Sequence, residues 1–172
     1  MKKILGLVLS LTVISGVCAG VLAYVDSITK GPIAEMKVKQ EQAAVKAVLP
    51  AGAEKVEAEG GFFVGKDASG KVVGYAAKGS DAGGYGGDVV LMVGFRADKR
   101  TVECYRTLAA AETPGLGMKL NTPEFAGQFA GKDAAKELKV KKDGGDVEAI
   151  TSATITSRAV CRAIADAQKK LR

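Results

Sequence analysis

The chain has 172 residues, a net charge of +6 and no histidine. This length suffices for one domain with a hydrophobic core plus an appendage. The absence of histidine excludes Ser-His and Cys-His nucleophile pairs and most zinc sites, so a hydrolytic enzyme is not expected. The basic residues are dispersed among 19 acids. No basic stripe alternates with aromatic residues, so no nucleic-acid partner is expected.

Residues 4–25 form an uncharged apolar run that follows two lysines. As a helix this run is roughly 33 Å long, enough to cross a bilayer. We predict a single-pass anchor in the cell (inner) membrane, with residues 1–3 cytoplasmic and the chain after Asp26 extracytoplasmic, or periplasmic. Because the span contains no acid, it cannot be an ion path. The alternative is a cleavable secretory signal with a cleavage site at residues 21–23.

Residues 26–50 are predicted to form a juxtamembrane stem. A turn is expected at residues 29–32, where Gly and Pro follow each other. From residue 33 to 49, apolar residues recur at three- and four-residue steps, which predicts a helix. Pro50 and the nearby Gly52 end the helix. The remainder, residues 51–172, is expected to form one small domain.

Short apolar segments punctuated by glycine predict an antiparallel meander in this domain. The expected strands cover residues 55–64, 71–78, 88–95 and 101–108. Tight turns are expected at residues 67–70 and 97–100, and a glycine-rich loop at residues 79–87. A short helix (124–128), a strand (138–142) and a clear amphipathic helix (157–171) follow. The predicted class is α+β, with an N-terminal transmembrane helix and a helical stem before a small antiparallel-sheet domain.

The glycine-rich loop is not a nucleotide-binding P-loop, because it lacks the Lys-Ser/Thr ending and precedes a strand instead of a helix. The three cysteines show no CxxC spacing, so no metal or iron–sulfur ligand is predicted. Cys18 lies inside the apolar run. Cys104 and Cys161 either pair in an oxidising compartment or remain two buried thiols.

Residues 151–157, Thr-Ser-Ala-Thr-Ile-Thr-Ser, crowd hydroxyl groups at the start of the last helix. Helix N-termini have unpaired backbone N–H groups and a partial positive charge, so they attract anions. One interpretation is an ordinary cap by Thr154, Thr156 or Ser157. The other is an anion site, to which Arg158 and Arg162 would add positive charge.

Three features together resemble the FMN-binding domain family, in particular the G subunit of the Rnf electron-transport complex. The related C subunit of the sodium-translocating NADH:quinone reductase shares this domain. The features are the Thr-Lys-Gly-Pro-Ile juncture (29–33) after one anchor, the Glu-Thr-Pro-Gly-Leu-Gly turn (112–117), and the hydroxyl-rich motif (151–157). The resemblance covers nearly the whole chain.

The resemblance implies that the phosphate of FMN is esterified to Thr154, with Thr156 as the second choice. A separate flavin transferase would form this bond. Ser152 and Ala153 belong to the same motif, and Tyr85 lies either against the flavin ring or on the surface. Glu112 is expected to hydrogen-bond the flavin or to fix the turn backbone. The remaining ring-side or ribityl-side candidates are Thr113, Leu116, Gly117 and Lys119.

Three positions depart from the family pattern. Ser152 stands where the motif usually has glycine, which matters if that position needs a positive φ. Ala110 replaces a histidine that often precedes the Pro-Gly turn. Glu148 replaces the usual aspartate six residues before Thr154.

The implied function is that of a membrane-anchored redox component of an ion-translocating complex, not a catalyst alone. It would carry covalent FMN in an Rnf-type complex that couples ferredoxin and NAD electron transfer to ion movement. Its expected partners are other membrane and iron–sulfur subunits, the flavin transferase and membrane lipid. The alternatives are a component like the C subunit of the sodium-translocating reductase, a stand-alone flavinylated reductase domain, or a non-redox docking module.

Overall fold

The computed structural model describes residues 2–172, and the side chains from residue 4 onward. The chain divides into two compact units, Met1–Gln40 and Glu41–Arg172.

The first helix, α1, covers Lys2–Val48 without interruption. It is the one helix of the described chain that is long and apolar enough to cross a membrane. The apolar side chains of residues 4–25 are all exposed, as a lipid-facing span requires. The boundary of the span at Asp26 and the side of the membrane on which the chain continues stay predictions.

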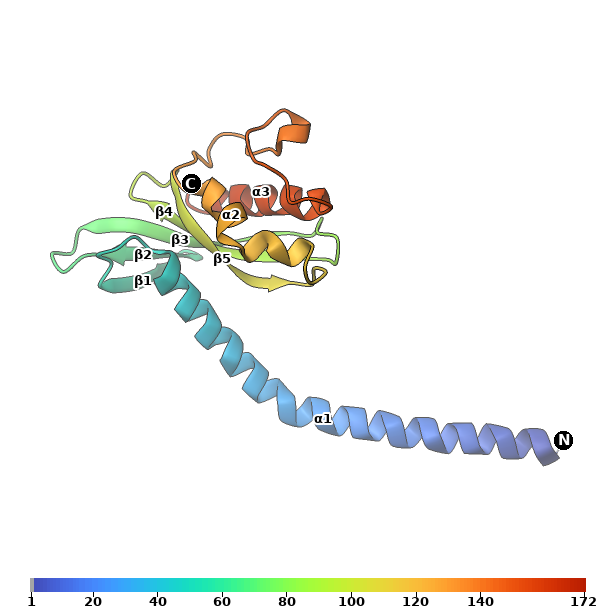
Figure 1. The fold of residues 1–172 in the computed structure, drawn as a ribbon. Coiled ribbons are helices and arrows are strands. Elements are labelled where there is room, and N and C mark those ends of the chain that lie inside the picture. Colours follow the sequence, from blue (N-terminus) through green and yellow to red (C-terminus); the bar gives the residue numbers. More distant parts are fainter. Residues whose placement is uncertain (1) are drawn as a thin grey trace. The chain divides into compact units, whose positions relative to one another are not determined.

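The turn expected at residues 29–32 is wrong, because Pro32 lies inside α1. A proline inside a helix removes one backbone hydrogen bond and usually produces a bend. Figure 1 shows a change of direction part-way along α1. The Thr29 hydroxyl donates to the carbonyl of Val25 at 2.8 Å, a contact that often bends a helix and here precedes the proline.

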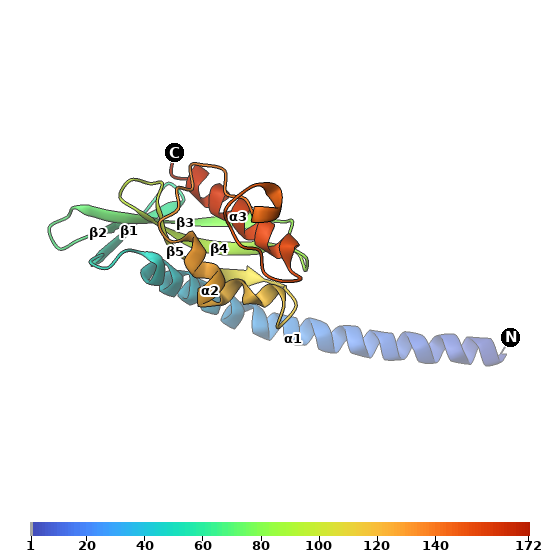
Figure 2. The same cartoon turned by 45° about the horizontal axis from the view of Figure 1, so that its top comes forward.

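The second unit contains a five-stranded antiparallel sheet with the strand order β1-β2-β3-β4-β5 (Figure 2). Each strand is therefore joined to its sequence neighbour, as the predicted meander requires. The strands are β1 (Lys55–Glu59), β2 (Phe62–Lys66), β3 (Val72–Asp81), β4 (Val89–Arg96) and β5 (Val102–Ala110).

The strand boundaries differ from the expectation in two places. Residues 55–64 form two strands and not one, because Gly60 and Gly61 make a turn with φ values of +55° and +92°. The first three residues of the expected loop, from Gly79 to Asp81, belong to β3 and pair with β4. The loop at the site described below is therefore shorter than the sequence suggested.

After the sheet the chain forms short helical turns and one long helix. These are η1 (Gly117–Asn121), α2 (Pro123–Ala126), η2 (Gly127–Phe129), η3 (Lys141–Asp143) and α3 (Thr154–Lys169). The strand expected at residues 138–142 is wrong: Val140 makes a single bridge to Val147 and the chain then turns. Helix α3 begins at Thr154 and not at residue 157, so the hydroxyl-rich motif forms its first turn.

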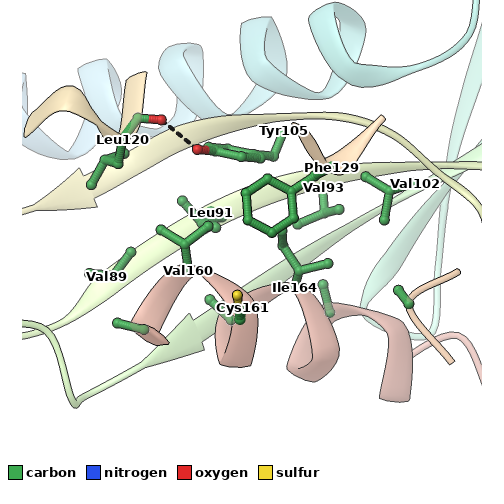
Figure 3. Packing of buried hydrophobic residues seen from close by; sticks show 14 of the residues in the cluster. Val89, Leu91, Val93, Val102, Tyr105, Leu120, Phe129, Val160, Cys161 and Ile164 are labelled. Carbon is green, nitrogen blue, oxygen red and sulfur yellow. Dashed lines mark hydrogen bonds between the residues drawn. The ribbon is translucent and has the colours of Figure 1, made fainter. Parts of the chain in front are cut away.

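The sheet is covered on both faces, which explains why β4 is an almost continuous apolar run. On one face lie α3 and the short helices, with a core that includes Leu91, Phe129 and Ile164 (Figure 3). Figure 3 also shows the buried Tyr105 hydroxyl donating to the carbonyl of Leu120, which fastens η1 to β5. On the other face, the end of α1 packs through Ala44, Val45, Val48 and Leu49 against Ala76 and Met92.

The two cysteines of the domain do not pair. Cys161 lies in the α3 core, whereas Cys104 packs on the opposite face of the sheet against the end of α1. Burial raises the pKa of both thiols, that of Cys161 to about 12. Of the two alternatives, free thiols are the arrangement found.

Helix α3 lies so close to β3 that no side chain fits between them at Gly79. A Cβ atom there would meet the carbonyl oxygen of Ala163 at 2.0 Å. Beside it, the Ser80 N–H donates to the Asp166 carboxylate at 3.0 Å and the Lys170 ammonium donates to the Lys78 carbonyl at 2.7 Å. A side chain of α3 and the lysine that follows it thus hydrogen-bond to backbone groups of β3.

We predict that Gly79→Ala destabilises the domain by about 1–3 kcal/mol, because α3 must move away from the sheet. Thermal unfolding of the purified chain in detergent measures this. Gly127→Ala is the matched control, since a Cβ there meets nothing within 4 Å. Equal unfolding temperatures for the two variants would contradict the close approach.

Candidate functional site

A cavity of about 440 Å³ lies where three segments of the domain meet. The segments are the glycine-rich loop after β3, the turn after β5 and the first turn of α3. Its volume falls within the range of roughly 300–1,000 Å³ that is usual for ligand clefts. The cavity is lined by Tyr85, Glu112, Thr113, Leu116, Gly117, Ser152, Ala153, Thr154, Ile155 and Thr156.

Every site residue expected from the sequence lines this cavity except Lys119. Lys119 lies beside a different hollow, formed with α2 and residues 148–151. The sequence interpretation missed Ile155, which is 47% exposed at the cavity. Its position between two motif threonines is the signal that could have identified it.

The first turn of α3 has no side-chain cap. The N-cap residue is Ala153, and no side chain hydrogen-bonds to the exposed end of the helix. The interpretation of Thr154, Thr156 or Ser157 as an ordinary N-cap is therefore wrong. The first N–H groups of a helix have no intrahelical partner, so this end remains available to an anion.

The hydroxyl groups of the motif have different environments. The Thr156 hydroxyl is buried and donates to Glu112 Oε2 at 2.8 Å. The Ser157 hydroxyl, also buried, donates to the Ala153 carbonyl and accepts from the Ile150 N–H, both at 3.0 Å. The half-buried Thr154 hydroxyl has no hydrogen-bond partner among residues 2–172. Within the first turn of α3, Thr154 is thus the threonine whose oxygen is free to react; the exposed hydroxyls of Thr113 and Ser152 also line the cavity but lie outside the helix.

Glu112 lies at the centre of the lining and is only 7% exposed. Its Oε1 accepts the Tyr85 N–H at 2.9 Å, and its Oε2 accepts the Thr156 hydroxyl. Gly117 must be glycine here, because a Cβ would lie 2.4 Å from Glu112 Oε2. Glu112 thus holds the backbone of the glycine-rich loop at Tyr85 and not that of its own turn, and its hydrogen bond to a flavin stays a prediction.

The arginines on α3 are neutralised by acids. Arg158 makes two hydrogen bonds of 2.7 Å to Asp143, and Arg162 makes two of 2.8 Å to Asp81. Hydrogen bonding to these guanidinium groups lowers the pKa of both carboxyl groups below the usual value. Neither arginine lines the cavity, so the donors it offers to an anion are backbone N–H groups and hydroxyls.

Ser152 adopts a left-handed conformation with φ +63°. This conformation costs a residue with a Cβ about 1–2 kcal/mol relative to glycine. The positive φ gives a physical reason for the glycine that the family motif usually carries at this position.

The rim of the cavity is apolar. Tyr85 is 73% exposed, Ile155 47% and Leu116 42%. These three side chains come from the three different segments that form the cavity. The site therefore combines an uncapped helix end with exposed apolar side chains.

Comparison with known proteins identifies the family. The FMN-binding domain matches residues 84–169, which include the whole cavity lining. The chain is 34% identical over 174 residues to the G subunit of the ion-translocating oxidoreductase complex of Methanosarcina acetivorans, covering 95% of this chain and 92% of that protein. The chain belongs to the G-subunit family of FMN-binding domain proteins.

A second relative supports the same family. This G-subunit homologue is 36% identical over 183 residues to the G subunit of the Na(+)-translocating ferredoxin:NAD(+) oxidoreductase complex of Acetobacterium woodii, covering 92% of this chain and 87% of that protein. Both relatives match along nearly their full length, so the resemblance inferred from the three sequence features is confirmed.

Two solved structures share the fold of the G-subunit homologue. Shewanella oneidensis NqrC has a TM-score of 0.52 and 24% identity, over 60% of this chain and 52% of that chain. The C subunit of the Na(+)-translocating NADH-quinone reductase of Parabacteroides distasonis has a TM-score of 0.52 and 27% identity, over 63% and 59%. The likeness spans little more than half of each solved chain and concerns the fold.

We predict that Ser152→Gly stabilises the domain by about 1 kcal/mol, because glycine adopts the positive φ without steric cost. Thermal unfolding in detergent measures the change. Ser152→Ala is the control and should give no gain, since alanine has the same Cβ. Equal stabilisation by both variants would show that loss of the hydroxyl, not relief of φ strain, is responsible.

Proposed function

We propose that this protein is the membrane-anchored electron-transfer subunit of an Rnf-type complex and carries FMN on Thr154 through a phosphoester. The observation that carries the proposal is the free hydroxyl of Thr154 at an uncapped helix N-terminus, inside a cavity of about 440 Å³. Membership of the FMN-binding domain family supplies the identity of the cofactor.

The residues present fit a flavin mononucleotide. The unpaired N–H groups at the start of α3 suit the remaining charge of a phosphodiester. Tyr85, Leu116 and Ile155 offer apolar surface to a planar ring, and Thr113 and Ser152 offer hydroxyls to a ribityl chain. When bound, FMN supplies one-electron and two-electron transfer, while the protein holds the ring and tunes its potential.

Thr154 would act as the nucleophile of attachment. Its oxygen forms the new bond to the flavin phosphorus and its proton leaves to a base. The phosphorus must arrive activated, as in a flavin dinucleotide, so that a phosphoanhydride bond breaks and a nucleoside monophosphate departs. Both oxygens of Glu112, the carboxylate of the lining, already accept hydrogen bonds, so the base would come from a separate flavin transferase.

The remaining parts of the proposal rest on the family and on α1. The names of the relatives suggest ferredoxin and NAD as the ends of the electron path and an ion as the coupled cargo. Other membrane and iron–sulfur subunits would move that ion, since residues 4–25 of this chain contain no charge. The full-length match to the G subunits favours this reading over a stand-alone reductase domain, and the FMN-binding domain favours it over a non-redox docking module.

We predict that Thr154→Ala abolishes covalent flavin in the protein co-expressed with a flavin transferase, because Thr154 is the residue of the first turn of α3 whose hydroxyl lines the cavity and is not held by another residue. In-gel fluorescence of the denatured chain measures the label.

Two variants serve as controls for this experiment. Thr156→Ala should still carry label at the end of expression, even if attachment is slower, since the Thr156 hydroxyl is bound to Glu112 and is not the attachment point. Thr151→Ala should be labelled like the natural chain, because Thr151 does not line the cavity. Label on Thr154→Ala, or none on the natural chain, would refute the proposed site.

We also predict that residues 41–172 lie outside the cytoplasm. A Ser69→Cys variant places a thiol in the exposed turn between β2 and β3. Made in a Cys104→Ala chain, it should react with a membrane-impermeant maleimide in intact spheroplasts, whereas the Cys104→Ala chain alone should not, since Cys161 is buried and Cys18 lies within the apolar run. Reaction only after lysis would reverse the orientation.

A further inference from the structure

Glu112 is a buried carboxylate that none of the ion pairs within residues 2–172 neutralises. Its exposed fraction is only 7%. A charge in such a place is costly unless hydrogen bonds compensate for the lost water. The structure supplies two: the Tyr85 N–H at 2.9 Å and the Thr156 hydroxyl at 2.8 Å.

These two hydrogen bonds join segments that are far apart in the sequence. Tyr85 lies 27 residues before Glu112, and Thr156 lies 44 residues after it. The side chain itself belongs to the turn after β5. One carboxylate therefore connects all three segments that form the cavity, and each of its oxygens binds a different one.

The connection acts on Thr154 through the first turn of α3. Thr156 is two residues beyond Thr154 in the same turn, and its hydroxyl is held by Glu112. The Ser157 hydroxyl bonds to Ile150 and Ala153. These anchors fix the backbone before and after Thr154, so its hydroxyl is held in place at the cavity wall.

We propose that Glu112 is a positioning residue for covalent flavin attachment: by accepting hydrogen bonds from the Tyr85 N–H and the Thr156 hydroxyl, it fixes Thr154 in the orientation that the transferase modifies. The inference rests on the proposed function and adds a residue that does not itself react. Small displacements of a reacting group reduce rates strongly, so the contribution is measurable as a rate of attachment.

The test uses the full chain in detergent with purified flavin transferase and a flavin dinucleotide, and follows the initial rate of covalent labelling. We expect Glu112→Ala to label about 10- to 100-fold more slowly than the natural chain. We expect Glu112→Gln to stay within about threefold, because its carbonyl can accept from the Tyr85 N–H while its amide N–H2 donates to the Thr156 oxygen, so both connections are kept. A Gln variant as slow as the Ala variant would show that charge matters instead of positioning and would overturn the proposal.

Asp98→Ala is the matched control for general destabilisation. Asp98 also accepts hydrogen bonds from backbone N–H groups and from a threonine hydroxyl, that of Thr101. It lies in the turn between β4 and β5, at the end of β4 away from the cavity. This variant should label at the natural rate, and a loss equal to that of Glu112→Ala would assign the effect to stability.

Variants of Thr156, the donor of this hydrogen bond, test it independently if Glu112→Ala fails to fold. Thr156→Val should label slowly, and Thr156→Ser, which keeps the hydroxyl, should label at nearly the natural rate. The double variant Thr156→Val, Glu112→Ala should slow labelling by less than the product of the two single slowdowns. The reason is that both substitutions remove the same hydrogen bond, that between Thr156 and Glu112. A double variant slowed by the full product of the two single slowdowns would overturn the proposal.

The outcomes separate this inference from the proposed function. Absence of label on the natural chain, or label on Thr154→Ala, overturns both. A natural chain that is labelled at Thr154, together with a folded Glu112→Ala variant that is labelled equally fast, overturns the positioning role alone.

Discussion

The close packing of α3 on β3 is the constraint on which the site depends. Gly79 lets the backbone of the helix approach the strand, and Asp166 hydrogen-bonds the adjacent strand backbone at Ser80. Arg162 extends the contact by binding Asp81 at the end of β3. With the helix fixed in this way, its N-terminus opens toward the loop after β3 and the turn after β5. The cavity is the space that these three ends enclose.

The backbone just before α3 is strained at Ser152. Ser152 has a positive φ that disfavours any residue with a Cβ. The conformation persists because hydrogen bonds of Ser157 and Thr156 fix the backbone immediately after it. Strain maintained by surrounding contacts is common where a reactive group must be held in one orientation. Within the first turn of α3, these bonds occupy the Thr156 and Ser157 hydroxyls and leave that of Thr154 free.

The two units of the chain separate two physical tasks. The apolar side chains of residues 4–25 suit lipid, whereas the domain surface carries charged pairs and an apolar rim at the cavity. A covalently attached cofactor would not be lost to the medium from such an anchored carrier. The proposed division leaves ion movement to other chains and gives this one the task of holding and exchanging electrons.

Much of the architecture could be predicted from the sequence because it depends on local patterns. The apolar run, the meander of short strands and the stripe of α3 follow from periodicity and from glycine turns. The predictions failed where a local signal competed with longer-range packing. Helix α1 continues through Pro32. Strand β3 continues through Gly79, where a loop was expected. Residues 138–142 form no strand, because Val140 alone makes a bridge, to Val147.

For the site, the sequence by itself determined which residues belong together. The motif at residues 151–157 and the turn at residues 112–117 carry a family pattern that requires no coordinates. Only the tertiary structure decided what each hydroxyl does. Hydrogen bonds form between groups that folding brings together, and Thr156 meets a carboxylate 44 residues away. That pairing leaves Thr154 as the free hydroxyl of the first helical turn and makes Glu112 the link between the three segments.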